Sequence, residues 1–439
     1  MPRLRFIVFS LVAILCCTPA WAADWPQFLG PNRNGTTPEA GLLKDWPKAG
    51  PKLKWKITNL GDGSAFSAPA IVKGRVYVMA AVDKDEHVFA LDEKDGSKIW
   101  STKIGTVGPN PAGAGNFHPG PRGTPTIDGD NLYALCSGGE LVCVSLANGG
   151  KVWSKNLKKD FGGKPGSWAY AESPLVDGDL VIVSPGGTSA AVVALKKKDG
   201  SVAWKSTVAG KGGKGSPNAA YGSAIAVEIG GVKQYVSVLN TGLVSVAAND
   251  GKFLWRFDKP SNKQGINIAT PLFHDGVVFN TSGYNSGGGA VKLSANQGKV
   301  TATESWFETD LTSAHSYGGF IRVGEHLYGT AAAGKGGKGG GGVQLVCVEL
   351  KSGQIVWKNA GVGNQSSLCC ADGMLYVRGQ NGKVALVEAS PKGYKEHGRF
   401  DQPNRGKEPA WPYPVVANGC LYLRDMTVLL CYDIGDTKK

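Results

Sequence analysis

The sequence predicts an all-β fold, an eight-bladed β-propeller of four-stranded antiparallel blades closed by its N-terminal strand. First, tryptophan recurs every 51 residues from Trp153 to Trp357, and a fixed period in this range indicates a repeat architecture. Second, a turn pair such as Asp95-Gly96 stands four residues before a tryptophan in several copies, as is typical of tight hairpins. Third, short alternating strands recur and Gly reaches 64 residues, which favours many strands and turns over helices.

Residues 1–22 have the pattern of a secretory signal peptide. Two arginines precede an apolar run, and small residues lead to a cleavage site after Ala22. Two alternatives stay open, a lipoprotein signal lipidated at Cys16 or Cys17 and a buried N-terminal helix. We expect an exported protein of the periplasm or cell surface. No later apolar run approaches the roughly 20 residues that a membrane-spanning helix needs.

Residues 23–52 are predicted to be an extended N-terminal segment and residues 53–435 the propeller. Each blade opens with a strand that usually follows a Ser/Thr-Pro step. The eight opening strands are marked by Pro69, Pro125, Pro174, Ala224, Pro271, Phe320, Leu368 and Pro414. The eighth blade lacks a tryptophan strand, whereas the strand around Trp55 has no blade of its own. We therefore expect this strand to pair with residues 429–432, because closure removes two exposed sheet edges.

Seven tryptophans are predicted to join the blades. We expect each ring to lie on the outer strand, flat against a small residue of the next blade. Burying such a ring removes about 150 to 250 Å² from water, worth roughly 4 to 6 kcal/mol before entropy is subtracted. The seven are Trp55, Trp100, Trp153, Trp204, Trp255, Trp306 and Trp357. This structural role accounts for the row of rings without a carbohydrate platform.

Export would leave seven of the nine cysteines. An odd number in a large chain does not indicate a disulfide framework, and we expect cysteines such as Cys143 and Cys431 to be buried small hydrophobes. The adjacent pair Cys369 and Cys370 lies in an apolar strand pattern. Side chains alternate along a strand, so this pair is predicted to point to opposite faces and to remain as free thiols.

The stretch ALDEKDGSKIW, residues 90–100, resembles the docking motif of the PQQ-like β-propeller repeats. That family includes quinoprotein alcohol dehydrogenases and the BamB-type outer-membrane assembly factor. The dehydrogenase resemblance implies pyrroloquinoline quinone (PQQ) and a divalent cation such as Ca²⁺ on the axis, with adjacent cysteines as part of the signature. The assembly-factor resemblance implies a platform that holds extended peptides at a blade edge or mouth.

The loops that enter the inner strands are predicted to form a ring around one mouth of the central channel. Aromatic side chains mixed with a few polar groups suit a pocket for a planar or sugar-like ligand; loop residues that only cover the blade ends are the alternative. The candidate residues are Phe66, His118, Arg122, Trp168, Tyr170, Glu172, Tyr221, Asn267, His315, Tyr317, Gln365, Trp411 and Tyr413. Among the polar candidates, we expect Glu172 to be the most informative about the chemistry of the ligand.

No complete catalytic constellation and no metal-ligand motif occurs in the sequence. Our leading hypothesis is therefore an exported, non-catalytic scaffold that binds a small molecule, a polysaccharide or a protein partner at the channel mouth. The alternatives are a PQQ- and Ca²⁺-dependent dehydrogenase and a BamB-like interaction platform at the outer membrane. Removing two signal arginines from the net charge of +13 leaves +11. Without a nucleic-acid-binding motif we expect no such partner, and we expect a monomer.

Overall fold

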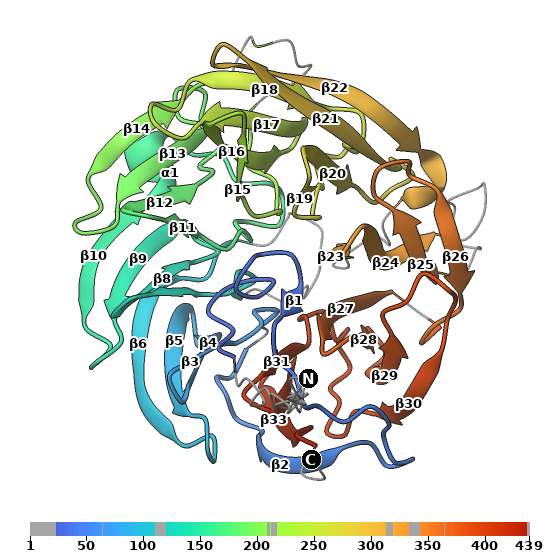
Figure 1. Ribbon diagram of the computed structural model, residues 1–439. Coiled ribbons are helices and arrows are strands. Elements are labelled where there is room, and N and C mark those ends of the chain that lie inside the picture. The colour runs from blue at the N-terminus through green and yellow to red at the C-terminus, as the bar shows by residue number, and fades with distance from the viewer. Residues whose placement is uncertain are drawn as a thin grey trace, which may run out of the picture.

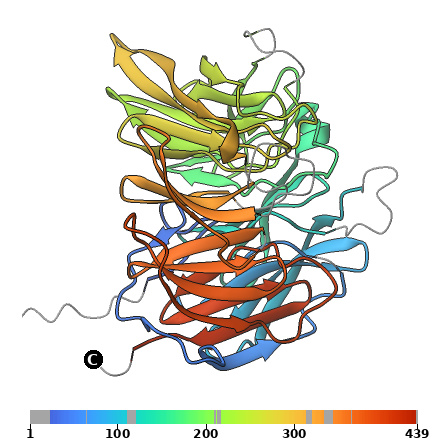
Figure 2. The same cartoon turned by 90° about the vertical axis from the view of Figure 1, so that its right-hand side faces the viewer.

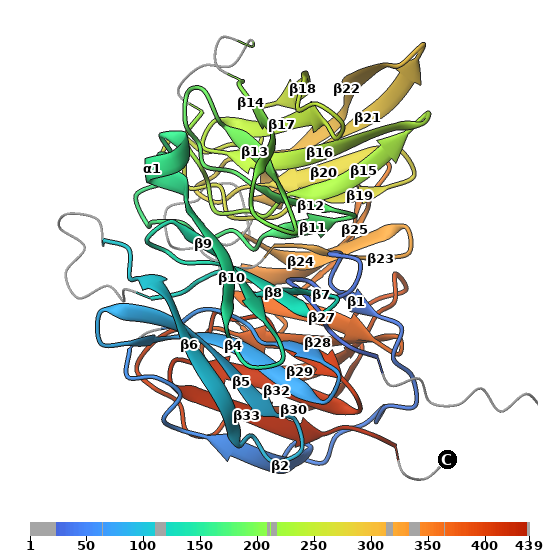
Figure 3. The same cartoon turned by 90° about the vertical axis from the view of Figure 1, so that its left-hand side faces the viewer.

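The computed structural model describes residues 23–63, 65–109, 120–208, 211, 217–312, 319–332, 343–363 and 365–436. Eight four-stranded antiparallel blades surround a central axis (Figure 1), which confirms the predicted eight-bladed β-propeller. In the side view of Figure 3, α1 (Leu157–Phe161) and β1 (Thr36–Thr37) lie toward opposite faces of the ring.

The innermost strand is three residues long in six blades and five or six residues long in blades 4 and 7, and the outermost strand of each blade faces solvent. Blades 1 to 4, from the axis outward, are β3 (Ala70–Val72), β4 (Arg75–Val82), β5 (Asp85–Asp92), β6 (Lys98–Thr106); β7 (Thr126–Asp128), β8 (Asn131–Leu135), β9 (Glu140–Ser145), β10 (Lys151–Asn156); β11 (Leu175–Asp177), β12 (Leu180–Val183), β13 (Val192–Lys196), β14 (Val202–Ser206); and β15 (Ile225–Ile229), β16 (Val232–Leu239), β17 (Gly242–Ala247), β18 (Phe253–Phe257).

Blades 5 to 8 repeat this order. In blade 8 the outermost strand comes from the N-terminal part of the chain. They are β19 (Leu272–His274), β20 (Val277–Thr281), β21 (Gly288–Asn296), β22 (Lys299–Glu308); β23 (Ile321–Val323), β24 (His326–Ala332), β25 (Val343–Glu349), β26 (Ile355–Asn359); β27 (Ser366–Ala371), β28 (Met374–Gly379), β29 (Lys383–Glu388), β30 (Glu396–Asp401); and β31 (Val415–Ala417), β32 (Cys420–Asp425), β33 (Val428–Asp433), β2 (Lys52–Ile57). A short 3₁₀ helix, η1 (Thr309–Leu311), follows β22.

The ring is closed between the two ends of the chain, as the sequence predicts. β2 pairs antiparallel with β33, with Trp55 opposite Cys431 and Ile57 opposite Leu429. Figure 1 shows β2 as the outer strand of the blade that contains β33. Because the pairing gives β33 a partner on both sides, no open edge is left inside the blade.

The tryptophans connect neighbouring blades by contact and by hydrogen bonding. Trp100 illustrates the arrangement, because its ring packs on Gly149, where an added Cβ would lie 2.8 Å from the ring. Six indole Nε1 groups donate to a backbone carbonyl of the next blade, at 2.9 to 3.2 Å. The pairs are Trp55 to Glu93, Trp100 to Leu146, Trp153 to Lys197, Trp204 to Ala248, Trp306 to Leu350 and Trp357 to Ser390. Trp255 instead donates to Gln234 Oε1 of its own blade, at 2.7 Å.

Hydroxyl groups beside the axis connect the inner strands. The backbone N–H of Thr124 donates to Ser173 Oγ at 2.8 Å, and Ser173 N–H donates to Ser223 Oγ at 2.9 Å. The N–H of Ser223 continues the series to Thr270 Oγ1 at 2.9 Å. The Ser or Thr of the recurring Ser/Thr-Pro step thus supplies an acceptor to the preceding blade, which fixes the inner strands relative to one another.

The N-terminal segment crosses one end of the central channel. Trp25 exchanges backbone hydrogen bonds with Ile71 of blade 1, at 2.8 and 2.9 Å. Asn34 O accepts from Arg322 N of blade 6 at 3.0 Å, and β1 pairs in parallel with β27 of blade 7. Figure 1 and Figure 2 show this segment against several blades. The segment is therefore held at both sides of the axis.

Cys369 and Cys370 lie in β27 and are both buried free thiols. Cys369 belongs to the apolar cluster shared with Tyr376 and blade 8, whereas Cys370 packs in a separate cluster with Tyr328 of blade 6. The two side chains therefore occupy opposite faces of the strand, as predicted. An adjacent-cysteine signature over a cofactor is incompatible with this position.

Candidate functional site: an aromatic cavity at the channel mouth

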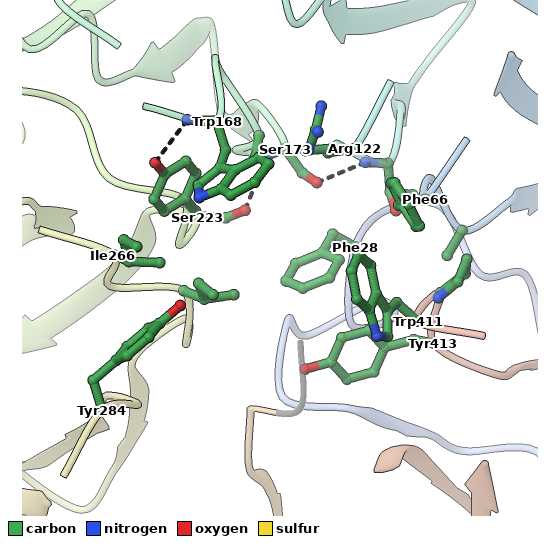
Figure 4. Close-up of a pocket in the computed structure, with 16 residues that line it drawn as sticks. Phe28, Phe66, Arg122, Trp168, Ser173, Ser223, Ile266, Tyr284, Trp411 and Tyr413 are labelled. Carbon is green, nitrogen blue, oxygen red and sulfur yellow. Dashed lines mark hydrogen bonds between the residues drawn. The ribbon is translucent and has the colours of Figure 1, made fainter. Parts of the chain in front are cut away.

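A cavity of about 230 Å³ lies at the end of the channel where the inner-strand loops converge. Segments of blades 1, 2, 3, 4, 5 and 8 contribute to its wall, together with the N-terminal segment. Its lining residues are Phe28, Phe66, Ala68, Arg122, Thr124, Trp168, Ala171, Ser173, Tyr221, Ser223, Ile266, Ile268, Tyr284, Trp411, Pro412 and Tyr413. Figure 4 shows aromatic rings on two facing sides of the cavity.

One wall is made by rings that pack on one another. The centroids of Phe66 and Trp411 are 4.7 Å apart with an interplanar angle of 36°. The guanidinium carbon of Arg122 stands 5.7 Å from the Phe66 centroid, within cation–π range. Arg122 Nη1 also donates to Gly120 O at 2.9 Å. These contacts hold a positive charge beside an aromatic surface.

The floor of the cavity includes Phe28, which comes from the N-terminal segment. Its ring meets Tyr413 edge to face, with centroids 5.4 Å apart. Tyr413 Oη accepts a hydrogen bond from Gly319 N at 2.8 Å, and burial raises the pKa of Tyr413 to about 12. Tyr413 therefore stays neutral near pH 7 and acts as a fixed apolar wall.

The opposite wall contains Trp168 and Tyr221. Tyr221 Oη accepts from the backbone N–H of Trp168 at 3.0 Å, a bond drawn in Figure 4. Burial raises the pKa of Tyr221, so its hydroxyl remains protonated. The inter-blade bonds to Ser173 and Ser223 lie at the same rim. The hydrogen bonds between the inner strands thus fix the position of this wall.

The structure brings six of the predicted ring residues together in the cavity. They are Phe66, Arg122, Trp168, Tyr221, Trp411 and Tyr413. His118, His315 and Tyr317 lie outside the described residues. Gln365 is not among the lining residues and instead precedes β27, where its carbonyl accepts from Gln380 N at 2.8 Å.

Three predicted ring residues have structural partners outside the cavity wall. Tyr170 Oη donates to Pro185 O at 2.9 Å, and Asn267 Nδ2 donates to Leu239 O and Asn240 O, each at 3.0 Å. Glu172 was expected to contact the ligand, but it is buried and its Oε1 accepts from Ser184 N at 2.6 Å.

The groups around Glu172 determine the pKa of its carboxyl. Burial raises its pKa to about 7, although backbone hydrogen bonding from Ser184 and the charge of Arg33 oppose the change. Arg33 is also buried, and it donates to Ser173 O at 2.8 Å and Pro174 O at 3.1 Å. Burial lowers the pKa of Arg33 to about 10, so it stays charged near pH 7. This pair supports the channel interior beneath the cavity.

Several lining residues were missed by the sequence interpretation. Phe28 lies in a segment outside the repeat, so no periodicity placed it near the axis. Ile266, Ile268 and Tyr284 belong to the connections around β19 and β20, at positions with no recurring pattern. The Ser/Thr-Pro step predicts the start of each inner strand, and the same signal also places the hydroxyls of Ser173 and its equivalents at the rim.

The described residues do not fit PQQ and Ca²⁺. A hard cation needs several converging oxygen ligands, but none of the described lining residues is a carboxylate. The described part of the chain also has no group of three or more His, Cys, Asp or Glu side chains placed to hold a metal. Cys369 and Cys370 lie within a blade.

The fold and the cavity define a β-propeller with an aromatic cavity at its channel mouth. The chain belongs to the family described as outer membrane protein assembly factor BamB, which matches residues 37–188 and 168–393. It is 25% identical over 329 residues to BamB of Yersinia pestis, covering 72% of each chain. It is 30% identical to BamB of Escherichia coli K12 over 116 residues, 26% of each chain.

Solved structures share the fold at low sequence identity. BamB from Moraxella catarrhalis aligns with a TM-score of 0.57 and 14% identity, over 86% of this chain and 100% of that chain. A quinohemoprotein alcohol dehydrogenase from Pseudomonas putida HK5 aligns with a TM-score of 0.63 and 13% identity, over 95% of this chain and 81% of that chain. Among the described residues, no helix has the length and apolar character needed to cross a membrane.

Proposed function

We propose that this chain is an exported, non-catalytic scaffold that holds a protein partner at the outer membrane. The family membership supports this class of function, because the relatives are named as outer membrane protein assembly factors. The aromatic cavity is the proposed anchor site. The observation that carries the proposal is the set of Trp, Tyr, Phe and Arg side chains gathered around one concave surface.

The chemistry of the cavity suits an anchor residue from a protein. Trp, Tyr and Arg dominate the energetics of protein interfaces, where they surround groups that become fully desolvated. The ring pair of Phe66 and Trp411 offers a flat apolar face, and Arg122 adds a donor for a carbonyl or carboxylate. An apolar side chain of a partner would fill the cavity while its backbone meets these donors.

Rigidity also favours binding. The rim is held by hydrogen bonds between blades, such as that from Ser173 N to Ser223 Oγ. A preformed site loses less conformational entropy when it binds than a mobile loop does. The same walls could stack a sugar ring or a small planar molecule, and these ligands are the alternatives to be separated by experiment.

The test is site-specific photo-crosslinking in cells. A photoreactive residue in place of Ile268, inside the cavity, should capture a defined outer-membrane or periplasmic protein. The same residue in place of Val202, which is 43% exposed on β14, is the matched control. Trp411→Ala should abolish the Ile268 product, because it removes one wall. Equal products from both positions, or no product from Ile268, would contradict the proposal.

Ligand titrations separate the alternatives. Thermal shift with a panel of oligosaccharides should give no stabilisation that depends on Trp411. Calorimetry with PQQ and Ca²⁺ should show no stoichiometric binding, because the described residues offer no cation ligands at the cavity. Tight PQQ binding accompanied by dye-linked alcohol oxidation would replace the scaffold proposal with a dehydrogenase.

A further inference from the structure

Lys54, Cys420 and Cys431 of the closing blade lie close together, and two of them, Lys54 and Cys420, differ from the other repeats. Lys54 Nζ lies 3.6 Å from the sulfur of Cys420, as a donor to it. Cys420 starts β32, and Cys431 lies on the neighbouring strand β33. In the register, Cys420 is opposite Asp433 and Tyr422 is opposite Cys431. The two cysteines are therefore diagonal neighbours on the same face of the sheet.

The lysine reaches this place because of a local irregularity in β2. The register between β2 and β33 shifts between Leu53 and Trp55, which leaves Lys54 as the extra residue of a β-bulge. The other six tryptophan strands have the same shift before their tryptophan, but the extra residue is always uncharged. These residues are Ile99, Val152, Ala203, Leu254, Ser305 and Val356.

The cysteine at the start of β32 is also specific to the closing blade. Seven other residues start the second strand of a blade, and none is a cysteine: Arg75, Asn131, Leu180, Val232, Val277, His326 and Met374. The position of Cys431, opposite a tryptophan, is a cysteine in two other blades, as Cys143 and Cys347. Among the described blades, the closing blade therefore differs in having cysteine at both of these strand positions, with the Lys54 ammonium beside one of them.

We propose that Cys420 and Cys431 form a redox-active pair that closes to a cross-strand disulfide by thiol–disulfide exchange, with the Lys54 ammonium beside the attacking sulfur. The Cys420 thiolate attacks one sulfur of a disulfide donor RS–SR, forming a mixed disulfide and releasing RS⁻. The Cys431 thiol then gives its proton to RS⁻ and attacks the Cys420 sulfur. A second RS⁻ leaves and takes up the proton released when Cys420 ionised. Two thiols are oxidised and one donor disulfide is reduced to two RSH.

The charges around the pair favour Cys420 as the attacking residue. Hydrogen bonding from Cys431 lowers the pKa of Cys420, and the Lys54 charge acts in the same direction, while burial opposes both. The pKa of Cys431 is raised by the same bond and by burial. A thiolate beside a lysine is the reactive form of cysteine.

Other ionisable groups face the same place from neighbouring elements. Glu39 of the N-terminal segment accepts from Gly419 N, and burial raises its pKa to about 7. Glu93 of blade 1 accepts from Tyr422 Oη at 2.8 Å and from Asn418 Nδ2, and Asp433 lies opposite Cys420. These carboxylates oppose a thiolate, so the lysine has a defined role in offsetting them.

A disulfide donor would reach the buried Cys420 sulfur past the side chain of Lys54. Lys54 is exposed on the outermost strand of its blade, whereas Cys420 is only 2% exposed beneath it. Displacing the flexible lysine side chain would uncover the Cys420 sulfur. Cys143 and Cys347 occupy the position equivalent to Cys431, and burial raises the pKa of each to about 11. They serve as internal controls for selectivity.

The experiment uses the purified full chain, reduced and then exposed to oxidised glutathione at pH 7. After alkylation and digestion without reduction, mass spectrometry should find the peptide pair linked through Cys420 and Cys431, while Cys143 and Cys347 are alkylated. Lys54→Met should slow the reaction by about threefold to tenfold. Lys52→Met, which alters the same exposed strand, should not slow it, and Lys54→Arg should retain the wild-type rate.

Three results would overturn the proposal. A stable glutathione adduct on Cys420 without the cross-link would show that Cys431 cannot reach it. Equal reaction of Cys143 would show that the pair has no special reactivity. An unchanged rate in Lys54→Met, with circular dichroism matching the wild type, would remove the role of the lysine. If that variant fails to fold, Lys54→Gln with the same measurements decides the question.

Discussion

The indole ring of Trp153 packs on Gly200 of the next blade, where a Cβ would stand 2.8 Å from the ring. Gly200 has a φ of +70°, and Trp153 Nε1 donates to Lys197 O of the same turn at 2.9 Å. Glycine therefore satisfies two demands here, a left-handed backbone and a flat contact surface for the ring.

Gly200→Ala should destabilise the protein by about 2 to 4 kcal/mol, because it adds a steric clash to left-handed backbone strain. Gly178→Ala is the matched control, since Gly178 has a φ of +57° but no atom near a Cβ. The control should lose only about 1 kcal/mol from backbone strain. Urea unfolding measures both variants. Equal losses would show that the ring contact contributes nothing.

The repeat could be predicted from the sequence because most blades contain the same short sequence patterns. The Asp-Gly turn before Trp100 and the Ser/Thr-Pro step at Ser173 both recur at blade spacing, and both make contacts to a neighbouring blade. Closure by Trp55 also followed from counting strands. These features depend on short segments whose pattern is repeated along the chain.

The cavity could be predicted only in part, because side-chain direction alternates along an extended segment. Ala171 and Ser173 line the cavity, whereas Tyr170 and Glu172 point to partners outside it. A loop that is correctly predicted to lie at the mouth therefore contains residues that line the cavity and residues that point away from it. Phe28 reaches the floor from a segment without periodicity. No sequence pattern indicated that this residue lies near the axis.

Closure of the ring gives the next prediction. A chain that lacks residues 24–58 loses β2, which leaves β33 as an unpaired edge, and also loses the segment across the channel. We expect an aggregated or unfolded product by size-exclusion chromatography, because exposed strand edges associate. A stable, folded monomer from this truncation would contradict the closing role of β2.

The cysteines of β27 should stay reduced. Cys369 and Cys370 face different clusters in a regular strand, and a bridge between adjacent residues would distort it. Alkylation of the denatured, unreduced protein followed by mass spectrometry should find both as thiols. Replacing both with Ala should cost about 1 to 2 kcal/mol, a modest change of core volume, and should leave crosslinking from the cavity unchanged. Detection of a Cys369–Cys370 disulfide would instead favour the dehydrogenase alternative.

The buried glutamates predict an unusual pH dependence of stability. Burial raises the pKa of Glu172 to about 7, and the pKa values of Glu39 and Glu86 change in the same direction to a similar value. The unfolded value is about 4.3. Between these two values the folded protein binds more protons than the unfolded chain, so the stabilising contribution is complete below about pH 4.3 and is lost as the pH rises toward 7.

Glu172→Gln tests this contribution at one position, because glutamine can still accept from Ser184 N but cannot ionise. In the wild type, the free energy of unfolding should fall between pH 5 and pH 7, by up to about 1.4 kcal/mol per pH unit for each such group. The variant should show a shallower fall, while Glu228→Gln, at an exposed site on β15, should follow the wild type. Urea midpoints at pH 5, 6, 7 and 8 provide the slopes. A wild-type stability that rises over this range, or a slope unchanged in Glu172→Gln, would mean that Glu172 is ionised in the folded protein and that Arg33 outweighs the effect of burial.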